Sequence, residues 1–431
     1  MGEDTMKKNI LAALVSSALL AVLPAAAAAE GSLTLDDSIR IAWENNEQIK
    51  AADSSVEAAG WDLKRAKGAG ALSVNISHTT AKIGGAYWQT FHIEEDPSSY
   101  FINTIAATLP LYTGGRVEHG VRQAEIGRQI SALQLKNTKQ KIRYEAAQAY
   151  YSILACRNTE QAKAEAVSQL EGHLQNVQQQ FSVGMVARAD ILRSEVALAD
   201  ARQGLVTAAN NTKLAEASFN KILGRPIPEP VKLAAGMEYV PENYELENCV
   251  EYALAHRPDQ VAAQKTVQQA GESIEIASAG KKPNLSFDAS YTTYDTKVDE
   301  FDTKQWIVGL TASLNVFDGN VTSSQINAAK ARRAQAEHQE KDGGAAVEFE
   351  VRQAYLNMKK AESNIGTNKV AVEKAREDFS LATARYGANL GTNLDVVDAQ
   401  VSLTNARTAY IESLYDYNVS RAGLETAVGK E

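Results

Sequence analysis

The sequence predicts a mixed fold that combines the strands of a membrane β-barrel with very long α-helices. Three observations support this fold class. One structural unit occurs twice in the 431 residues. Each copy contains two short segments of alternating apolar and polar residues, followed by a proline-free helical segment much longer than a typical globular helix. The order within each copy is helix, two strands, very long helix and return helix, so one chain contributes four strands.

An internal duplication defines the domain organisation. Residues 111–224 align without a gap with residues 316–429 at a shift of 205 positions. The earlier part of each copy aligns at a larger shift of 211 positions, as Leu35 does with Leu246. We therefore expect three parts, which are a first repeat over 30–225, an irregular proline-containing connector over 226–244 and a second repeat over 245–431.

The first 29 residues have the features of a secretory signal peptide. Lys7 and Lys8 supply positive charge, residues 10–22 form an apolar core, and alanines at 27–29 offer a cleavage site. The apolar core is shorter than the roughly 20 residues that a membrane-spanning helix needs. We expect the mature chain to begin near Glu30 and to leave the cytoplasm.

Each copy is expected to start with a helix of moderate length, over 34–68 and 245–279, and to continue into two strands. In the first strand Leu72, Val74 and Ile76 alternate with polar residues, a pattern typical of membrane strands and equally of soluble hairpins. The four strands are expected at about 72–82, 100–112, 284–295 and 304–317. Aromatic residues near their loop ends, as in an interfacial girdle, are Tyr87, Trp88, Tyr291, Tyr294 and Trp306.

The third and fourth segments of each copy are helices. Residues 114–181 and 319–386 are rich in Ala, Gln, Glu, Lys and Arg and contain no proline. At 1.5 Å per residue, each helix would extend for roughly 100 Å. Return helices are expected over 188–223 and 392–428.

Four strands from one chain cannot close a barrel in a membrane. An open sheet edge is excluded in lipid, because its backbone groups would lack hydrogen-bond partners. Closure must therefore come from several copies of the chain. Three copies would supply twelve strands, an even number suited to a closed barrel.

Composition and motifs exclude several functional classes. Asp and Glu outnumber Lys and Arg by 53 to 44, so the chain has no basic field for binding nucleic acid. The two cysteines, Cys156 and Cys249, are too few for a disulfide framework, and we expect both to be free. The histidines lack metal-ligand spacing, and no nucleophile, phosphate-binding or zinc-protease motif occurs. We predict no catalytic residue, metal or cofactor.

Three features together point to a known family. They are the duplicated order, the helix-tip motifs around Phe181 and Tyr386, and the strand-to-helix junctions 109–114 (Leu-Pro-Leu-Tyr-Thr-Gly) and 314–319 (Leu-Asn-Val-Phe-Asp-Gly). In these features the chain resembles the TolC-like outer-membrane efflux proteins. The resemblance covers the whole mature chain. It implies a homotrimer with a twelve-stranded barrel among outer-membrane lipids and a helical tunnel through the periplasm. It also implies a periplasmic adaptor and an inner-membrane transporter as partners.

Asp395 and Asp398 lie three residues apart, so on a helix they share one face. In a trimer they would form acidic rings that bind cations, and the resemblance places them at the periplasmic gate. The alternative is structural, because Thr392 and Asp395 have the spacing of a capping box. The resemblance also implies a gate latch, a hydrogen bond between Tyr386 and Asp190.

The helix tips are the expected docking site for the adaptor. The candidate residues there are Phe181, Gly184, Met185, Asn389 and Leu390. Packing within the turns explains the apolar ones equally well. A different reading of the whole chain, a periplasmic coiled-coil or adaptor protein without a pore, accounts for the helices and the signal peptide but leaves the alternating strands unexplained.

Overall fold

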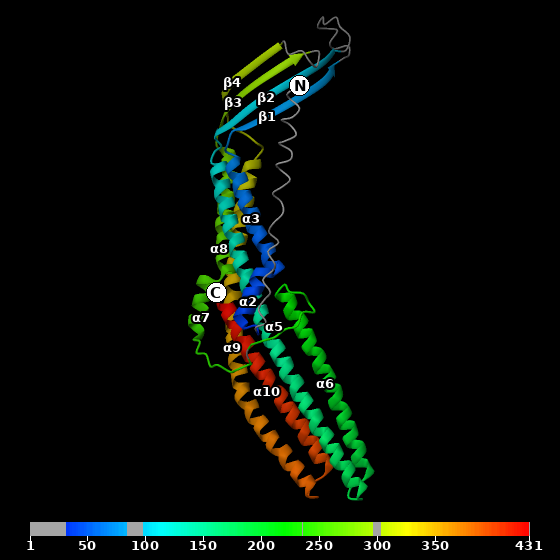
Figure 1. The fold of residues 1–431 in the computed structure, drawn as a ribbon. Helices are drawn as coiled ribbons and strands as arrows, with labels where there is room; N and C mark the ends of the chain where they lie inside the picture. The colour runs from blue at the N-terminus through cyan, green and yellow to red at the C-terminus, as the bar shows by residue number, and fades with distance from the viewer. Residues whose placement is uncertain (1–31, 84–97, 235, 296–302, 431) are drawn as a thin grey trace, which may run out of the picture.

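The computed structural model describes the chain except for residues 1–31, 84–97, 235, 296–302 and 431. The predicted signal peptide and the loop aromatics Tyr87 and Trp88 lie outside the described residues. The described chain is long and narrow, with a four-stranded sheet at one end and two helical hairpins reaching to the other (Figure 1). Among its described helices, none combines the length and the apolar character needed to cross a membrane.

Four long helices make up the two hairpins, and their ends repeat the duplication seen in the sequence. α5 and α9 have 67 residues each, which corresponds to about 100 Å. α9 begins and ends 205 positions after α5, and α10 begins 205 positions after α6. The bounds are α5 Arg116–Ser182, α6 Arg188–Ile222, α9 Val321–Gly387 and α10 Asn393–Val428.

Left-handed backbone positions repeat at the same shift. Each residue with positive φ in the first copy has a counterpart 205 positions later, at both ends of the long helix and after the return helix. The pairs are Gly114 with Gly319, Gly115 with Asn320, Gly184 with Asn389, and Gly224 with Gly429. Since asparagine tolerates this conformation better than most residues, it can replace glycine in the second copy. The two copies therefore share backbone geometry as well as helix positions.

The sheet is antiparallel with the strand order β1-β2-β3-β4. Its strands are β1 Ser73–Ile83, β2 Ser98–Tyr112, β3 Asn284–Asp295 and β4 Thr303–Ser313. Ile76 lies opposite Ile105 in the first hairpin, and Phe287 lies opposite Leu310 in the second. Phe287 lies 211 positions after Ile76, and Leu310 lies 205 positions after Ile105. These are the shifts of the duplication, so the two hairpins have equivalent registers.

β4 is shorter than the sequence predicted, ending at Ser313 and not near residue 317. Its partner β3 begins at Asn284, which lies opposite Ser313, so none of the described strands runs beside the residues that follow. The side chain of Val316 is 89% exposed, and Leu314 and Phe317 are also exposed. By contrast β2 continues to Tyr112 because β3 runs beside it.

The first helix of each copy is broken, where the sequence predicted one continuous helix. The segments are α2 Leu35–Asn45 and α3 Glu47–Gly68 in the first copy, and α7 Leu246–His256 and α8 Pro258–Ser278 in the second. Asn46 and Arg257 occupy the breaks with extended backbones, again 211 positions apart. Pro258 disfavours a helical conformation at Arg257. In the first copy the Asn46 side chain accepts a hydrogen bond from the Gln48 amide and so caps α3.

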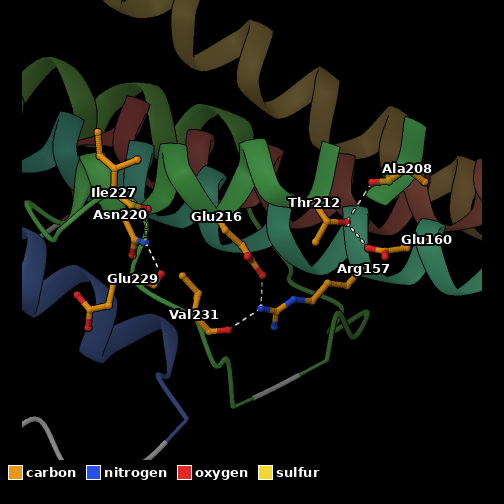
Figure 2. A network of polar contacts seen from close by, with 9 residues as sticks. All are labelled: Arg157, Glu160, Ala208, Thr212, Glu216, Asn220, Ile227, Glu229 and Val231. Atoms are coloured by element: carbon orange, nitrogen blue, oxygen red, sulfur yellow. Dashed lines mark hydrogen bonds and ion pairs between the residues drawn. The ribbon is translucent and has the colours of Figure 1, made fainter. Parts of the chain in front are cut away.

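The connector packs against α5 and the C-terminal end of α6 through polar contacts (Figure 2). The guanidinium of Arg157 on α5 donates to the Glu216 carboxylate and to the Val231 carbonyl, both at 2.6 Å. The buried amide of Asn220 donates to the carbonyls of Ile227 and Glu229. These bonds hold the connector over the apolar core, whose largest fully buried side chains include Tyr150, Phe219 and Tyr417.

Replacing Asn46 with alanine is expected to destabilise the middle of the molecule. Its amide also donates to the Ile222 carbonyl at 2.8 Å, so the change removes both a cap and a contact with the end of α6. We expect a loss of about 1–3 kcal/mol in the free energy of unfolding, measured by thermal or denaturant unfolding. The neighbouring exposed Asn45→Ala is the control, and equal losses in the two variants would contradict this role.

Candidate functional site

The two hairpin turns lie together at the end of the molecule furthest from the sheet (Figure 1). Gly184 and Asn389 take left-handed conformations two residues after the ends of α5 and α9. In each turn the next amide bonds back to the helix, from Met185 to the Gln180 carbonyl and from Leu390 to Arg385. The side chains of Met185 and Leu390 are 59% and 72% exposed. The tips therefore present apolar residues on a defined backbone.

Asp395 forms a capping box with Thr392 at the start of α10. The Thr392 amide donates to the Asp395 carboxylate at 2.8 Å, and the Asp395 amide donates to the Thr392 hydroxyl at 3.2 Å. The hydrogen bond from the Thr392 backbone, followed by that with its side chain, lowers the pKa of Asp395. The structural role predicted as the alternative is thus present, and the carboxylate remains exposed and charged.

Asp398 lies one turn further along α10 and is also exposed. It forms no ion pair with any residue that the structure describes. Arg193 occupies the corresponding position of α6, 205 residues earlier. Only the second of the two tips therefore carries two acidic residues on one helical face.

The predicted hydrogen bond between Tyr386 and Asp190 is absent, which corrects the expected latch. The Tyr386 side chain is 6% exposed, and its buried hydroxyl has no hydrogen-bond partner among the described residues. The ring packs against Val177 and Val396 and meets the ring of His173 edge to face at 5.1 Å. Burial raises the pKa of Tyr386, and the nearby charge of Asp190 raises it further. Tyr386 joins the hairpins by packing.

A buried polar cluster centred on Asn393 connects the two hairpins instead. Its amide oxygen lies 2.6 Å from His173 Nε2 on α5 and accepts a hydrogen bond from the Ser194 hydroxyl on α6. Its amide nitrogen donates to the Asp190 carbonyl at 3.0 Å. Asn393 is 3% exposed, and His173 and Ser194 are buried as well. We refer to these residues, with the Asp190 carbonyl, as the Asn393 cluster.

The bonding pattern assigns the proton on His173. The Asn393 oxygen can only accept, so His173 donates from Nε2. Burial lowers the pKa of His173, and the hydrogen bond to Asn393 opposes this effect. The imidazole is therefore neutral at neutral pH. This cluster is not predicted from the sequence, because its residues are far apart in the chain. Asn393 directly follows the capping residue Thr392, and no motif marks its side chain as a contact.

The described residues contain no group of three or more His, Cys, Asp or Glu arranged to hold a metal ion. Cys156 and Cys249 are free thiols. The sites that the geometry offers are therefore the acidic residues of α10, the exposed turns and the contacts between the hairpins.

Comparison with known proteins identifies the family. The sequence matches the outer membrane efflux protein family over residues 39–225 and 249–430, which is most of the chain. The chain belongs to this family. The efflux protein BepC of Brucella suis is 22% identical over 322 residues, covering 74% of this chain and 70% of BepC. TolC of Escherichia coli is 26% identical over 299 residues, covering 66% of this chain and 60% of TolC.

Solved structures of outer-membrane channels share the fold. The CmeC channel of Campylobacter jejuni superimposes with a TM-score of 0.82 at 16% identity, covering 92% of this chain and 85% of CmeC. This likeness and the four antiparallel strands confirm the predicted fold class. As a member of the outer membrane efflux family the chain is an outer-membrane channel protein and not an enzyme. The adaptor reading without a pore is therefore set aside.

Removing the Tyr386 hydroxyl is expected to leave the conductance of the channel unchanged. Tyr386→Phe breaks no hydrogen bond among the described residues. Asn393→Ala leaves several buried polar groups unpaired, at a cost of about 1–3 kcal/mol. We expect single-channel conductance in planar bilayers to match the unmodified protein in the first variant and to rise in the second.

The matched control for that prediction is Asn418→Ala, which removes another asparagine that is 3% exposed on α10 but lies beside the connector. It should lower stability without raising conductance. A conductance increase in Tyr386→Phe, with Asn393→Ala unchanged, would restore the predicted latch and contradict the cluster.

Acidification is expected to weaken the contact between the hairpins through His173. Because the pKa of His173 is lowered in the folded protein, the unfolded or separated state binds the proton more readily. The stabilisation is complete above the ordinary pKa of about 6.5 and declines as the pH falls towards the lowered value. Conductance recorded from about pH 7.5 to about pH 5.5 should rise in the unmodified protein and stay level in His173→Gln. The same pH response in both proteins would contradict this assignment.

Proposed function

We propose that three copies of this chain form a passive exit duct that crosses the outer membrane and the periplasm, as part of a tripartite efflux or type I secretion system. The observation that supports this most directly is a four-stranded sheet with an exposed apolar face and two unpaired edges, joined to helices of about 100 Å. Such a sheet is stable in lipid only when further copies pair with its edges.

The exposed face of the sheet has the layout of a lipid-facing band. Ile76, Ile105, Tyr291 and Trp306 form one row across the four strands. The next row towards the loops is polar and consists of His78, Asn103, Thr293 and Lys304. Aromatic residues beside a polar row are typical of a membrane–water boundary. The two rows together support a boundary between lipid and water at the loop end of the sheet.

The duplication also specifies how neighbouring chains would pair. Within the chain β2 pairs with β3, and Ile105 lies opposite Tyr291. The counterparts of these strands are β4 and β1, so we infer that Leu310 of one chain lies opposite Thr80 of the next. This register also places Leu314 opposite Ile76 and, beyond the counterpart of the irregularity between Pro110 and Tyr112, Phe317 opposite Val74, which matches exposed apolar residues. The strand missing beyond Ser313 would then form at the seam between chains.

Asp395 and Asp398 are proposed to line the periplasmic mouth. Three chains would place six carboxylates there, and rings of this kind bind and select cations. The low pKa of Asp395 keeps its ring charged well into the acid range. Opening would widen the mouth as the tip helices move apart, with the energy supplied by a partner.

The exposed turns are proposed as the docking surface for a periplasmic adaptor, which would link the duct to an inner-membrane transporter. Met185 and Leu390 project from equivalent positions on backbones held by Gly184 and Asn389. A closed ring of three chains would present these turns six times. An adaptor with repeated apolar grooves fits that arrangement.

Cysteine cross-linking at the seam tests the proposed duct. Asn75 and Asn315 would face each other between chains, whereas within one chain two strands separate β1 from the end of β4, a distance of about 14 Å. We expect Asn75→Cys with Asn315→Cys to give disulfide-linked trimers in outer membranes. Asn75→Cys with Thr311→Cys, displaced by four residues, is the register control. Monomers from both pairs would contradict the duct.

Neutralising both acidic rings is expected to reduce cation binding at the mouth. Asn retains an oxygen for the cap at position 395, so Asp395→Asn with Asp398→Asn removes charge with little change in the turn. Block of bilayer conductance by multivalent cations should weaken by about tenfold. Glu412→Gln, an exposed acidic residue further along α10, serves as the control and should leave the block unchanged. Equal block in all three proteins would exclude the rings.

A further inference from the structure

The order of the four long helices shows where a second chain would pack. They lie side by side as α9, α10, α5 and α6, with α5 packed along α10 in the middle (Figure 1). The duplication makes α9 the counterpart of α5, and α6 the counterpart of α10. An α9–α6 contact between neighbouring chains therefore repeats the α10–α5 contact seen within the chain. The proposed trimer closes its helical ring through three such contacts.

Transferring the Asn393 cluster to that interface changes its chemistry. The counterpart of His173 is Asp378 on α9, and the counterpart of Asn393 is Arg188, the first residue of α6. A neutral histidine–asparagine contact within the chain thus corresponds to an acidic and a basic residue between chains. The shorter aspartate is matched by a longer arginine, so the pair can span the same backbone separation.

Both residues are available for such a contact. Arg188 and Asp378 are exposed, and neither forms an ion pair with any residue that the structure describes. Lys374, which lies one turn before Asp378, is already paired with Glu377 at 2.9 Å. The counterpart of the Asp190 carbonyl, which accepts from Asn393, is the carbonyl of Asp395. It offers Arg188 a second acceptor in the same place.

An aromatic residue on the same side supports this arrangement. Phe181 is the counterpart of Tyr386, at the end of α5. Tyr386 is buried against the neighbouring hairpin of its own chain, whereas Phe181 is 42% exposed. Tyr386 contacts His173 and Val177, and the counterparts of these two residues are Asp378 and Ala382. Phe181 would therefore contact Asp378 and Ala382 of another chain. This assigns Phe181 to the interface between chains and leaves Met185 and Leu390 for the adaptor.

We propose that Arg188 of each subunit forms an ion pair with Asp378 of the next, with the Asp395 carbonyl as a second acceptor. The proposal rests on the proposed trimer. Neutral Asn393 clusters within chains and ion pairs between chains then alternate around the periplasmic mouth. High salt screens the ion pairs and leaves the buried clusters intact, so the tips separate between subunits first.

Cross-linking identifies which chains carry the two residues. On a Cys156→Ser, Cys249→Ser background, Arg188→Cys with Asp378→Cys is treated with a short bismaleimide and examined on denaturing gels. We expect linked dimers and trimers. His173→Cys with Asn393→Cys, the equivalent pair within one chain, should cross-link internally and still migrate as a monomer. If the Asn75–Asn315 cysteine pair links the chains but the Arg188–Asp378 pair gives only monomers, this proposal alone is overturned. If both pairs give only monomers, the proposed trimer is overturned as well.

Charge exchange tests whether the pair holds the mouth closed. Arg188→Asp and Asp378→Arg should each increase open probability in bilayers, and the combined variant should return it towards the unmodified value. Loss of one exposed ion pair is expected to shift the equilibrium between the closed and the open mouth by about threefold, and loss of all three pairs by about thirtyfold. Increases that simply multiply in the combined variant, with the trimer intact, would overturn the proposal.

Discussion

Hydrogen bonding of the backbone inside lipid is the constraint on which the rest of this structure depends. The sheet carries an apolar face, yet the outer edges of β1 and β4 have no partner among the described residues. An isolated chain would expose those edges to a medium that cannot satisfy them. The proposed pairing with further copies would satisfy both edges and would cover the exposed residues after Ser313.

The duplication turns contacts within one chain into templates for contacts between chains. Helix ends, left-handed residues and strand registers all repeat at fixed shifts, so each α10–α5 or β2–β3 contact has a defined equivalent. The residues at these equivalent positions differ, as His173 and Asp378 do. Similar backbones can therefore hold neutral contacts inside a subunit and charged contacts between subunits.

Much of the fold could be predicted from sequence because it depends on local pattern. Alternation of apolar residues located the strands, and the absence of proline located α5 and α9. The break at Arg257 is marked in the sequence by Pro258. At Asn46 the side chain caps α3 locally and also bonds to the carbonyl of Ile222, which is distant in sequence and could not be predicted. The end of β4 depends on where β3 begins. At the tips, the capping box of Asp395 was recognisable, whereas the bond between His173 and Asn393 required the packed hairpins.

The number of chains in the native particle is the most direct test of the proposed closed duct. Protein extracted from the outer membrane in mild detergent can be measured by light scattering with the detergent contribution subtracted. For a barrel closed by twelve strands, we expect three chains per particle. A stable particle containing one chain would leave both sheet edges open and would contradict the closed duct.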